Sequence, residues 1–151
     1  MKEETKMEIL RALAFDGVGK AREIIEQEER EEYEMEEKIR GMIENIEKEY
    51  EAFRDDMQNN HSIEEVFNSA YKICTYNDLF MYFQNEDMLE IGEFIQSVFH
   101  GKDINKFITK NHILASLYDF LMDCEYGYTE TWEDIQDLIR NYIVYRILDE
   151  K

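Results

Sequence analysis

Hydrophobic residues recur at helical spacing through most of the chain, and the most regular stretch lies between Lys20 and Met57. This stretch contains no Pro and a single Gly, Gly41, and is rich in residues that favour helices. At ~1.5 Å per residue, a helix over this stretch would be roughly 57 Å long. The pattern predicts one long helix, over about residues 20–57.

The apolar positions in the second half of this helix follow steps of four and three residues, as in a heptad repeat. They are Met35, Ile39, Met42, Ile46, Tyr50, Phe53 and Met57. Projected toward the N-terminus, the same steps fall on Glu32 and Glu28. We therefore expect the second half of the helix to pack against a core and the Glu-rich segment over residues 27–32 to lie in solvent.

A shorter amphipathic stretch, Glu3 to Phe15, comes before the long helix. Gly17 and Gly19 then break the pattern and predict a turn. This first helix either folds back on the start of the long helix or meets a second copy of the chain. The residues that would carry self-association are Leu10, Leu13, Ile24 and Ile25.

Several shorter helical patterns follow the long helix. Ser62 and Glu65 fit a capping box, and Thr131 is placed to cap the last helix. Residues 142–148 are rich in β-branched side chains, but they continue the helical period of that last helix. The predicted fold is all-α, with residues 1–58 forming the N-terminal helix and the long helix, and residues 59–151 forming a bundle of four to five helices.

Composition agrees with this fold and restricts the partners. The chain has no Pro, 44% hydrophobic and 13% aromatic residues, so we expect an ordered helical protein despite its 35% charged residues. The formal net charge of −19 argues against direct binding to nucleic acid or to anionic membranes, because phosphate contacts need Lys and Arg. It suits a partner with a basic surface.

The sequence lacks the usual signatures of catalysis and metal binding. Cys74 and Cys124 have no Cys or His at zinc-ligand spacing, and His61, His100 and His112 all lie near predicted helix ends. No phosphate-binding loop or nucleophile motif is present. We therefore predict a non-enzymatic protein with no cofactor and no metal.

Targeting signals are also absent from the sequence. Met1 is followed by Lys2-Glu3-Glu4 rather than by an apolar segment, which is unlike a secretory signal. No run of about 18 apolar residues exists that would predict a membrane-spanning helix. These observations favour a cytoplasmic protein.

Charge is distributed differently in the two halves of the chain. In the long helix many Glu residues precede a base by four positions, so these charges are expected to pair along the helix. Between Lys110 and Arg140 there is no Lys or Arg. A surface with charges of one sign attracts a basic cleft. The predicted partner-binding residues of this segment are Asp119, Asp123, Glu125, Tyr126, Tyr128, Glu130, Glu133, Asp134 and Asp137.

One region resembles a known kind of domain. The stretches Glu49-Tyr50-Glu51-Ala52-Phe53, Ser62-Ile63-Glu64-Glu65-Val66 and Ala70-Tyr71-Lys72 resemble a small helical domain of unknown function from bacterial mobile elements. The resemblance covers about residues 45–85 and implies no catalytic residues. In size, acidity and helical content the chain is similar in kind to inhibitors from phages and mobile elements, including anti-CRISPR proteins that occupy nucleic-acid clefts.

These observations lead to two functional hypotheses. The first is an acidic inhibitor that binds a basic, nucleic-acid-handling protein such as a CRISPR effector, in the manner of a DNA mimic. The second is a structural or adaptor protein that forms a homodimer through its N-terminal helices.

Overall fold

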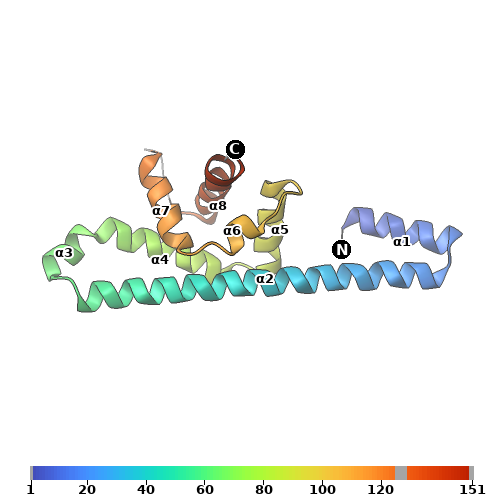
Figure 1. Ribbon diagram of the computed structural model, residues 1–151, viewed down its shortest axis with the longest axis horizontal. Helices are drawn as coiled ribbons and strands as arrows, with labels where there is room; N and C mark the ends of the chain where they lie inside the picture. Colours follow the sequence, from blue (N-terminus) through green and yellow to red (C-terminus); the bar gives the residue numbers. More distant parts are fainter. Residues whose placement is uncertain (1, 125–128, 150–151) are drawn as a thin grey trace. The chain divides into compact units, whose positions relative to one another are not determined.

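The computed structural model describes residues 2–124 and 129–149, and these residues are helical apart from short connections, with no β-strand among them. The predicted all-α fold is therefore confirmed (Figure 1). The elements are α1 (Glu3–Phe15), α2 (Val18–Asn59), α3 (Ile63–Asn68), α4 (Ala70–Asn85), α5 (Met88–Phe99), α6 (Asn105–Ile108), α7 (Ile113–Asp123), α8 (Trp132–Tyr142) and the π-helical segment η1 (Ile143–Leu148).

The predicted long helix is α2, which has 42 residues and begins and ends within two residues of the predicted limits. The chain divides into two compact units, Met1–Lys38 and Ile39–Lys151, and the division between them lies inside α2. The reason is burial along the apolar seam: Ile39, Met42 and Ile46 are at most 1% exposed and belong to the core of the second unit.

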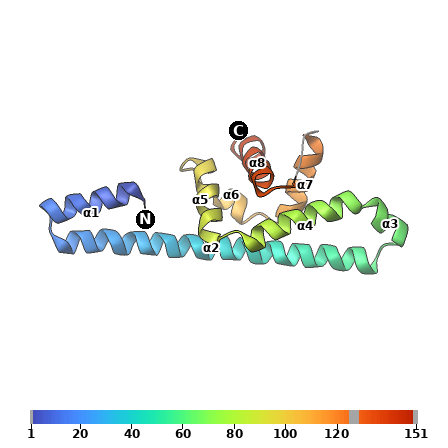
Figure 2. The same ribbon diagram turned by 180° about the vertical axis from the view of Figure 1, so that it is seen from behind.

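In the second unit, α4 runs antiparallel to the C-terminal half of α2 (Figure 2). Three contacts fix the register. The Phe53 and Tyr76 rings stack at 4.2 Å, the Tyr50 and Phe80 rings stack at 4.1 Å, and Gln84 Nε2 donates to Glu47 Oε1 at 2.6 Å. From contact to contact the residue number in α2 falls from 53 to 50 to 47 while the number in α4 rises from 76 to 80 to 84, as an antiparallel helix pair requires.

The rest of the second unit packs around α5, α7, α8 and η1. The buried side chains include Phe99, Phe107, Leu114, Leu117 and Ile143. Residues 143–148 are helical, as the continued period predicted, although the helix widens into a π-helical turn there. Both predicted caps are present as complete capping boxes, Ser62 with Glu65 on α3 and Thr131 with Asp134 on α8.

In the first unit, α1 folds back along the start of α2, which confirms one of the two predicted arrangements. Gly17 has a φ of +93°, a conformation that favours glycine, and it makes the turn. The backbone N–H of Lys2 then donates to Glu28 Oε1 at 3.0 Å, and Ala12 and Ala21 are buried. The expectation that residues 27–32 lie in solvent was wrong at Glu28, which is only 7% exposed because α1 covers it.

Candidate interaction surfaces

The predicted acidic residues of α7 lie at the surface of the second unit. The α7 face that carries Leu114, Leu117 and Leu121 is buried, so Asp119 and Asp123, four residues apart, are exposed on another face. Arg146 of η1 donates to Asp123 at 3.4 Å. Asp119 has no ion pair with Lys or Arg among the described residues.

The acidic residues around α8 divide into two groups. Asp134 accepts the backbone N–H of Thr131 and so serves the capping box, and Asp137 accepts from Arg140 at 2.6 Å. Glu130 and Glu133 are exposed and make no ion pair within the described ranges. The free carboxylates of the predicted set are therefore fewer than the sequence indicated, because Arg140 and Arg146 reach back to the segment that lacks bases.

The remaining predicted residues of this set, Glu125, Tyr126 and Tyr128, lie outside the described residues. The neighbouring Trp132 is 45% exposed, and its ring lies edge-on to Tyr82 with centroids 5.9 Å apart. Trp132 therefore offers a partly exposed aromatic surface next to the free carboxylate of Glu133.

A cluster of aromatic rings lies close to Asp119 and includes a single cation. Lys72 Nζ lies 5.5–5.8 Å from the ring centroids of Phe53, Tyr76 and Tyr118, within the range of a cation–π interaction. Burial raises the pKa of the Tyr118 hydroxyl, and the neighbouring Tyr71 and Asp119 raise it further. The Lys72 ammonium therefore lies among rings contributed by α2, α4 and α7.

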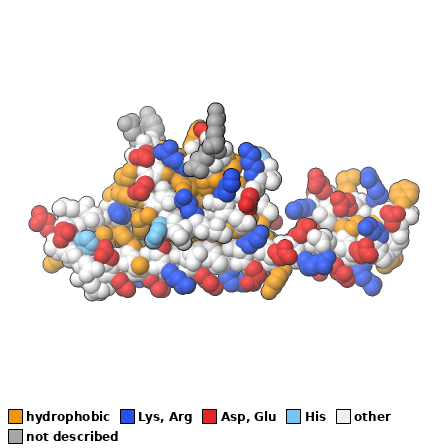
Figure 3. Space-filling model, viewed as in Figure 1, with side chains coloured by type: hydrophobic (Ala, Val, Ile, Leu, Met, Phe, Trp, Pro, Cys, Tyr) orange, Lys and Arg blue, Asp and Glu red, His pale blue; other side chains and the backbone are white. Residues whose placement is uncertain are grey.

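The predicted self-association residues occupy two environments in the first unit. Leu10 is 66% exposed and Leu13 is 49% exposed, whereas Ile24 and Ile25 are half-buried. Three other large apolar side chains of α1 and the start of α2 are also exposed: Met7 at 68%, Phe15 at 83% and Val18 at 64%. The space-filling view shows hydrophobic side chains on the surface of this unit (Figure 3).

Sequence analysis missed an apolar pocket of about 390 Å³ where α2, α3 and α4 meet. It is lined by Tyr50, Phe53, Arg54, Met57, Gln58, His61, Ile63, Val66 and Ile73. The apolar steps of α2 include three of these nine residues, Tyr50, Phe53 and Met57, but the placement of α3 and α4 against α2 could not be predicted from a linear pattern.

His61 lies at the edge of this pocket between two carboxylates. Its Nε2 lies 2.9 Å from Asp56 Oδ2 and its Nδ1 lies 3.3 Å from Glu65 Oε2. The hydrogen bond to Asp56, and then the one to Glu65, raise the pKa of His61 because both favour the charged imidazolium. This arrangement connects the end of α2 to the start of α3.

Comparison with known proteins found no matching family model, no matching curated protein and no matching solved structure. The resemblance of residues 45–85 to a mobile-element domain stays a prediction. No helix of the described residues has the length and apolar character needed to cross a membrane.

Proposed function

We propose that the protein is a non-enzymatic acidic inhibitor that binds the nucleic-acid cleft of a basic protein, of which a CRISPR effector is the leading example. The observation that carries the proposal is the set of exposed carboxylates Asp119, Glu130 and Glu133, which make no ion pair with any described residue, in a chain of net charge −19. Complementary charge of this kind raises the rate of association with a basic cleft and the specificity of the complex.

Two structural features support this use of the surface. The free carboxylates are borne by or lie beside α7 and α8, which contact each other within the second unit. The helices that carry Asp119 and Glu133 are fixed by burial of Leu117, Ile135 and Ile139, so these two charges would be presented without ordering their helices on binding. Trp132 adds a partly exposed aromatic group of the kind that anchors protein interfaces.

The test asks whether binding depends on the carboxylates of α7 and α8 or only on the net charge of the chain. The double variant D119K/E133K reverses two free carboxylates, and the control E51K/D55K reverses two exposed carboxylates of α2. Both variants raise the net charge by the same amount. Binding to a guide-loaded CRISPR effector nuclease is measured at ~0.1 and ~0.5 M salt, with poly-lysine as a nonspecific polycation.

We expect D119K/E133K to weaken binding to the effector at least ~10-fold at low salt, and E51K/D55K to weaken it less than ~3-fold. Target DNA should compete with the protein for the effector. Equal losses for the two variants would show that only total charge matters. A protein that binds the effector without competing with DNA would also contradict the proposal.

A second candidate function is favoured by the exposed apolar side chains of the first unit. The large apolar side chains of Met7, Leu10, Leu13, Phe15 and Val18 are all exposed, and exposed apolar surface of this kind can mark a protein–protein interface. In this alternative the protein is a structural or adaptor protein that dimerises through α1 and the start of α2.

Sedimentation velocity at tens of micromolar protein tests this alternative. The variant L10E/L13E should convert a dimer to a monomer, whereas the control I63E/F67E should not, although it alters two exposed apolar residues of the second unit. A monomeric wild-type protein at these concentrations would exclude the dimer.

A further inference from the structure

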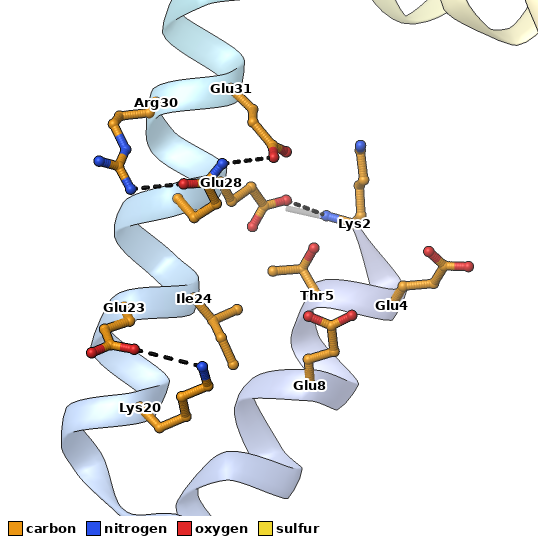
Figure 4. Close-up of a pocket in the computed structure, with 11 residues that line it drawn as sticks. Lys2, Glu4, Thr5, Glu8, Lys20, Glu23, Ile24, Glu28, Arg30 and Glu31 are labelled. Atoms are coloured by element: carbon orange, nitrogen blue, oxygen red, sulfur yellow. Dashed lines mark hydrogen bonds and ion pairs between the residues drawn. The ribbon is translucent and has the colours of Figure 1, made fainter. Parts of the chain in front are cut away.

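The first unit contains a pocket of about 580 Å³ between α1 and the start of α2 (Figure 4). Its volume lies in the range of pockets that hold small organic molecules. Among its lining residues, Glu4, Thr5 and Glu8 come from α1, and Ile24 and Glu28 come from α2. The pocket lies entirely within residues 2–31, so it is separate from the acidic residues of α7 and α8.

Glu28 is the unusual member of this pocket, because it is a buried acid with half of its carboxylate unused. It is only 7% exposed, and its Oε1 accepts the backbone N–H of Lys2 at 3.0 Å. Its Oε2 is buried and has no hydrogen-bond partner in the described part of the chain. Burying a carboxylate without a partner is unfavourable, so the pocket is preorganised to receive a cation or a hydrogen-bond donor.

The two bases of α2 that line the pocket, Lys20 and Arg30, contact residues other than Glu28. Lys20 Nζ pairs with Glu23 Oε2 at 3.6 Å. Arg30 donates to Gln27 Oε1 at 2.7 Å, and Gln27 Nε2 in turn donates to Glu31 Oε1 at 3.0 Å. These residues line the same pocket as Glu28, and Lys20 and Arg30 are each held by a contact within α2. None of these bases neutralises Glu28.

The α1 side of the pocket adds further negative charge. Glu4 and Glu8 lie one helical turn apart, and neither makes an ion pair among the described residues. The side chain of Lys2 extends away from the Glu28 carboxylate, so only its backbone contacts Glu28 (Figure 4). Thr5 offers a hydroxyl oxygen as an additional acceptor between the two helices.

The shape and chemistry of the pocket select one class of cation. No group of three or more Asp, Glu, His or Cys side chains in the described ranges is placed to hold a metal ion. An alkylammonium head group carries three N–H donors, which match Glu28 Oε2 and the Thr5 hydroxyl. Its methylene chain can lie on Ile24. A chain with a second ammonium can then reach Glu4 or Glu8.

We propose that this pocket binds a linear alkylammonium cation whose head group pairs with Glu28. The same chemistry is offered by a free polyamine and by a lysine side chain of a basic protein. The proposal does not depend on the function assigned to the acidic residues of α7 and α8.

The full-length chain is titrated with spermidine, with a tri-lysine peptide and with Mg²⁺ at constant ionic strength, while backbone amide NMR signals are followed. The variant E28Q removes the buried charge but keeps an oxygen that can accept from Lys2. The matched control E29Q removes an exposed charge from the next position of the same helix. The double variant E4Q/E8Q serves as a second pocket variant.

We expect spermidine to shift the amides of Thr5, Glu8 and Glu28, and E28Q to weaken its binding at least ~10-fold, as loss of one buried charge pair predicts. E29Q should change the affinity less than ~2-fold. Tighter binding of spermidine than of the peptide would identify a free polyamine as the ligand class, and the reverse would identify a protein side chain.

Three results would overturn the proposal. The first is an equal loss for E28Q and E29Q, and the second is an equal effect of Mg²⁺ on the same amides. The third is amide shifts that spread over all acidic surfaces. If the helical signal of E28Q shows that α1 has detached from α2, the double variant E4Q/E8Q decides, because it removes both carboxylates that the second ammonium can reach: an affinity unchanged from wild type would contradict binding in this pocket.

Discussion

Glu49 shows how one side chain can fix a helix far away in the sequence. His112, the residue before α7, has a left-handed backbone with a φ of +60° and provides no side-chain cap. Glu49 of α2 supplies the cap instead, because its two carboxylate oxygens accept the backbone N–H groups of Leu114 at 2.8 Å and Ala115 at 2.9 Å. A negative charge at a helix N-terminus also interacts favourably with the helix dipole.

We therefore predict that E49A lowers the free energy of unfolding by about 1–3 kcal/mol, because it leaves two half-buried N–H groups without acceptors. Urea unfolding followed by circular dichroism measures this change. The control E51A alters an exposed acid two positions away on α2, and its effect should stay within about 0.5 kcal/mol. Equal effects would show that the contact with α7 contributes nothing.

His61 leads to a prediction about pH. The hydrogen bond to Asp56 is the main cause that raises its folded-state pKa. The pKa of Asp56 is lowered first by its hydrogen bond with Asn60 and then by the one with His61, and the pKa of Glu65 is lowered first by its hydrogen bonds with Ser62 and then by the one with His61. A raised histidine pKa contributes stability that is fully present below the ordinary value of ~6.5 and is lost as pH rises through the folded-state pKa. The side-chain NMR titration of His61 should therefore have a midpoint above that of an unfolded peptide.

The variant D56N should move the His61 midpoint down, because the hydrogen bond to Asp56 contributes most to the raised pKa of His61. A control variant, D55N, alters a neighbouring exposed carboxylate that does not contact the ring and should leave the midpoint in place. An unshifted midpoint in D56N would show that the contact is not formed in solution.

At the scale of residues, contacts between positions close together in the sequence were predictable, and contacts between positions far apart in the sequence were not. The Ser62–Glu65 and Thr131–Asp134 boxes span three residues and were predictable. The partners of Glu28 and Glu49 lie 26 and 65 residues away, and periodicity contains no information about them. Both acids looked like ordinary solvated positions of a charged helix.

At the scale of elements, Asp134 illustrates the difference between an acid that is free to bind and an acid that holds a helix. Its carboxylate accepts the N–H of Thr131 at 3.2 Å, while its own N–H donates to Thr131 Oγ1 at 3.1 Å. Glu133, the preceding residue, makes no such contact in the described residues. Glu133 and Asp134 are therefore adjacent in the sequence, but only Asp134 holds the start of the helix.

We predict that D134A destabilises the protein by about 0.5–2 kcal/mol, in the range of a lost helix cap, and that E133A changes stability by less than about 0.5 kcal/mol. Thermal unfolding of the two variants and of T131A measures the difference, and T131A should behave like D134A. If E133A were as damaging as D134A, the cap would not be the cause.

The positions of the helices were predictable because burial repeats with the helical period. The ion pairs of the acidic residues follow no such period and were not predictable. Burial of Ile39, Met42 and Ile46 repeats with the helical period, so the seam of α2 was visible in the sequence. The interval between Lys110 and Arg140 lacks bases along the chain. In space, however, the Arg140 and Arg146 side chains reach Asp137 and Asp123. Counting charges along a chain overestimates how many remain unpaired.

At the scale of the whole molecule, the division inside α2 explains why one helix serves two purposes. The charged stretch before Ile39 belongs to the first unit, and the apolar seam after it belongs to the core of the second. A unit of fewer than about 40 residues rarely folds by itself, because it buries too little apolar surface. The second unit has a large core with several fully buried aromatic and aliphatic side chains, including Tyr82, Phe83 and Phe99.

We predict that a chain covering residues 34–151 folds by itself, with a urea midpoint close to that of the full chain, because it retains Ile39, Met42 and Ile46. A chain covering residues 50–151 lacks these three buried side chains. Removing each costs about 2–5 kcal/mol, and the sum of about 6–15 kcal/mol is as large as the whole stability of a typical domain, about 5–15 kcal/mol. It should therefore fail to unfold cooperatively when followed by circular dichroism. Cooperative unfolding of the shorter chain, or loss of folding in the longer one, would place the division between the units elsewhere in α2.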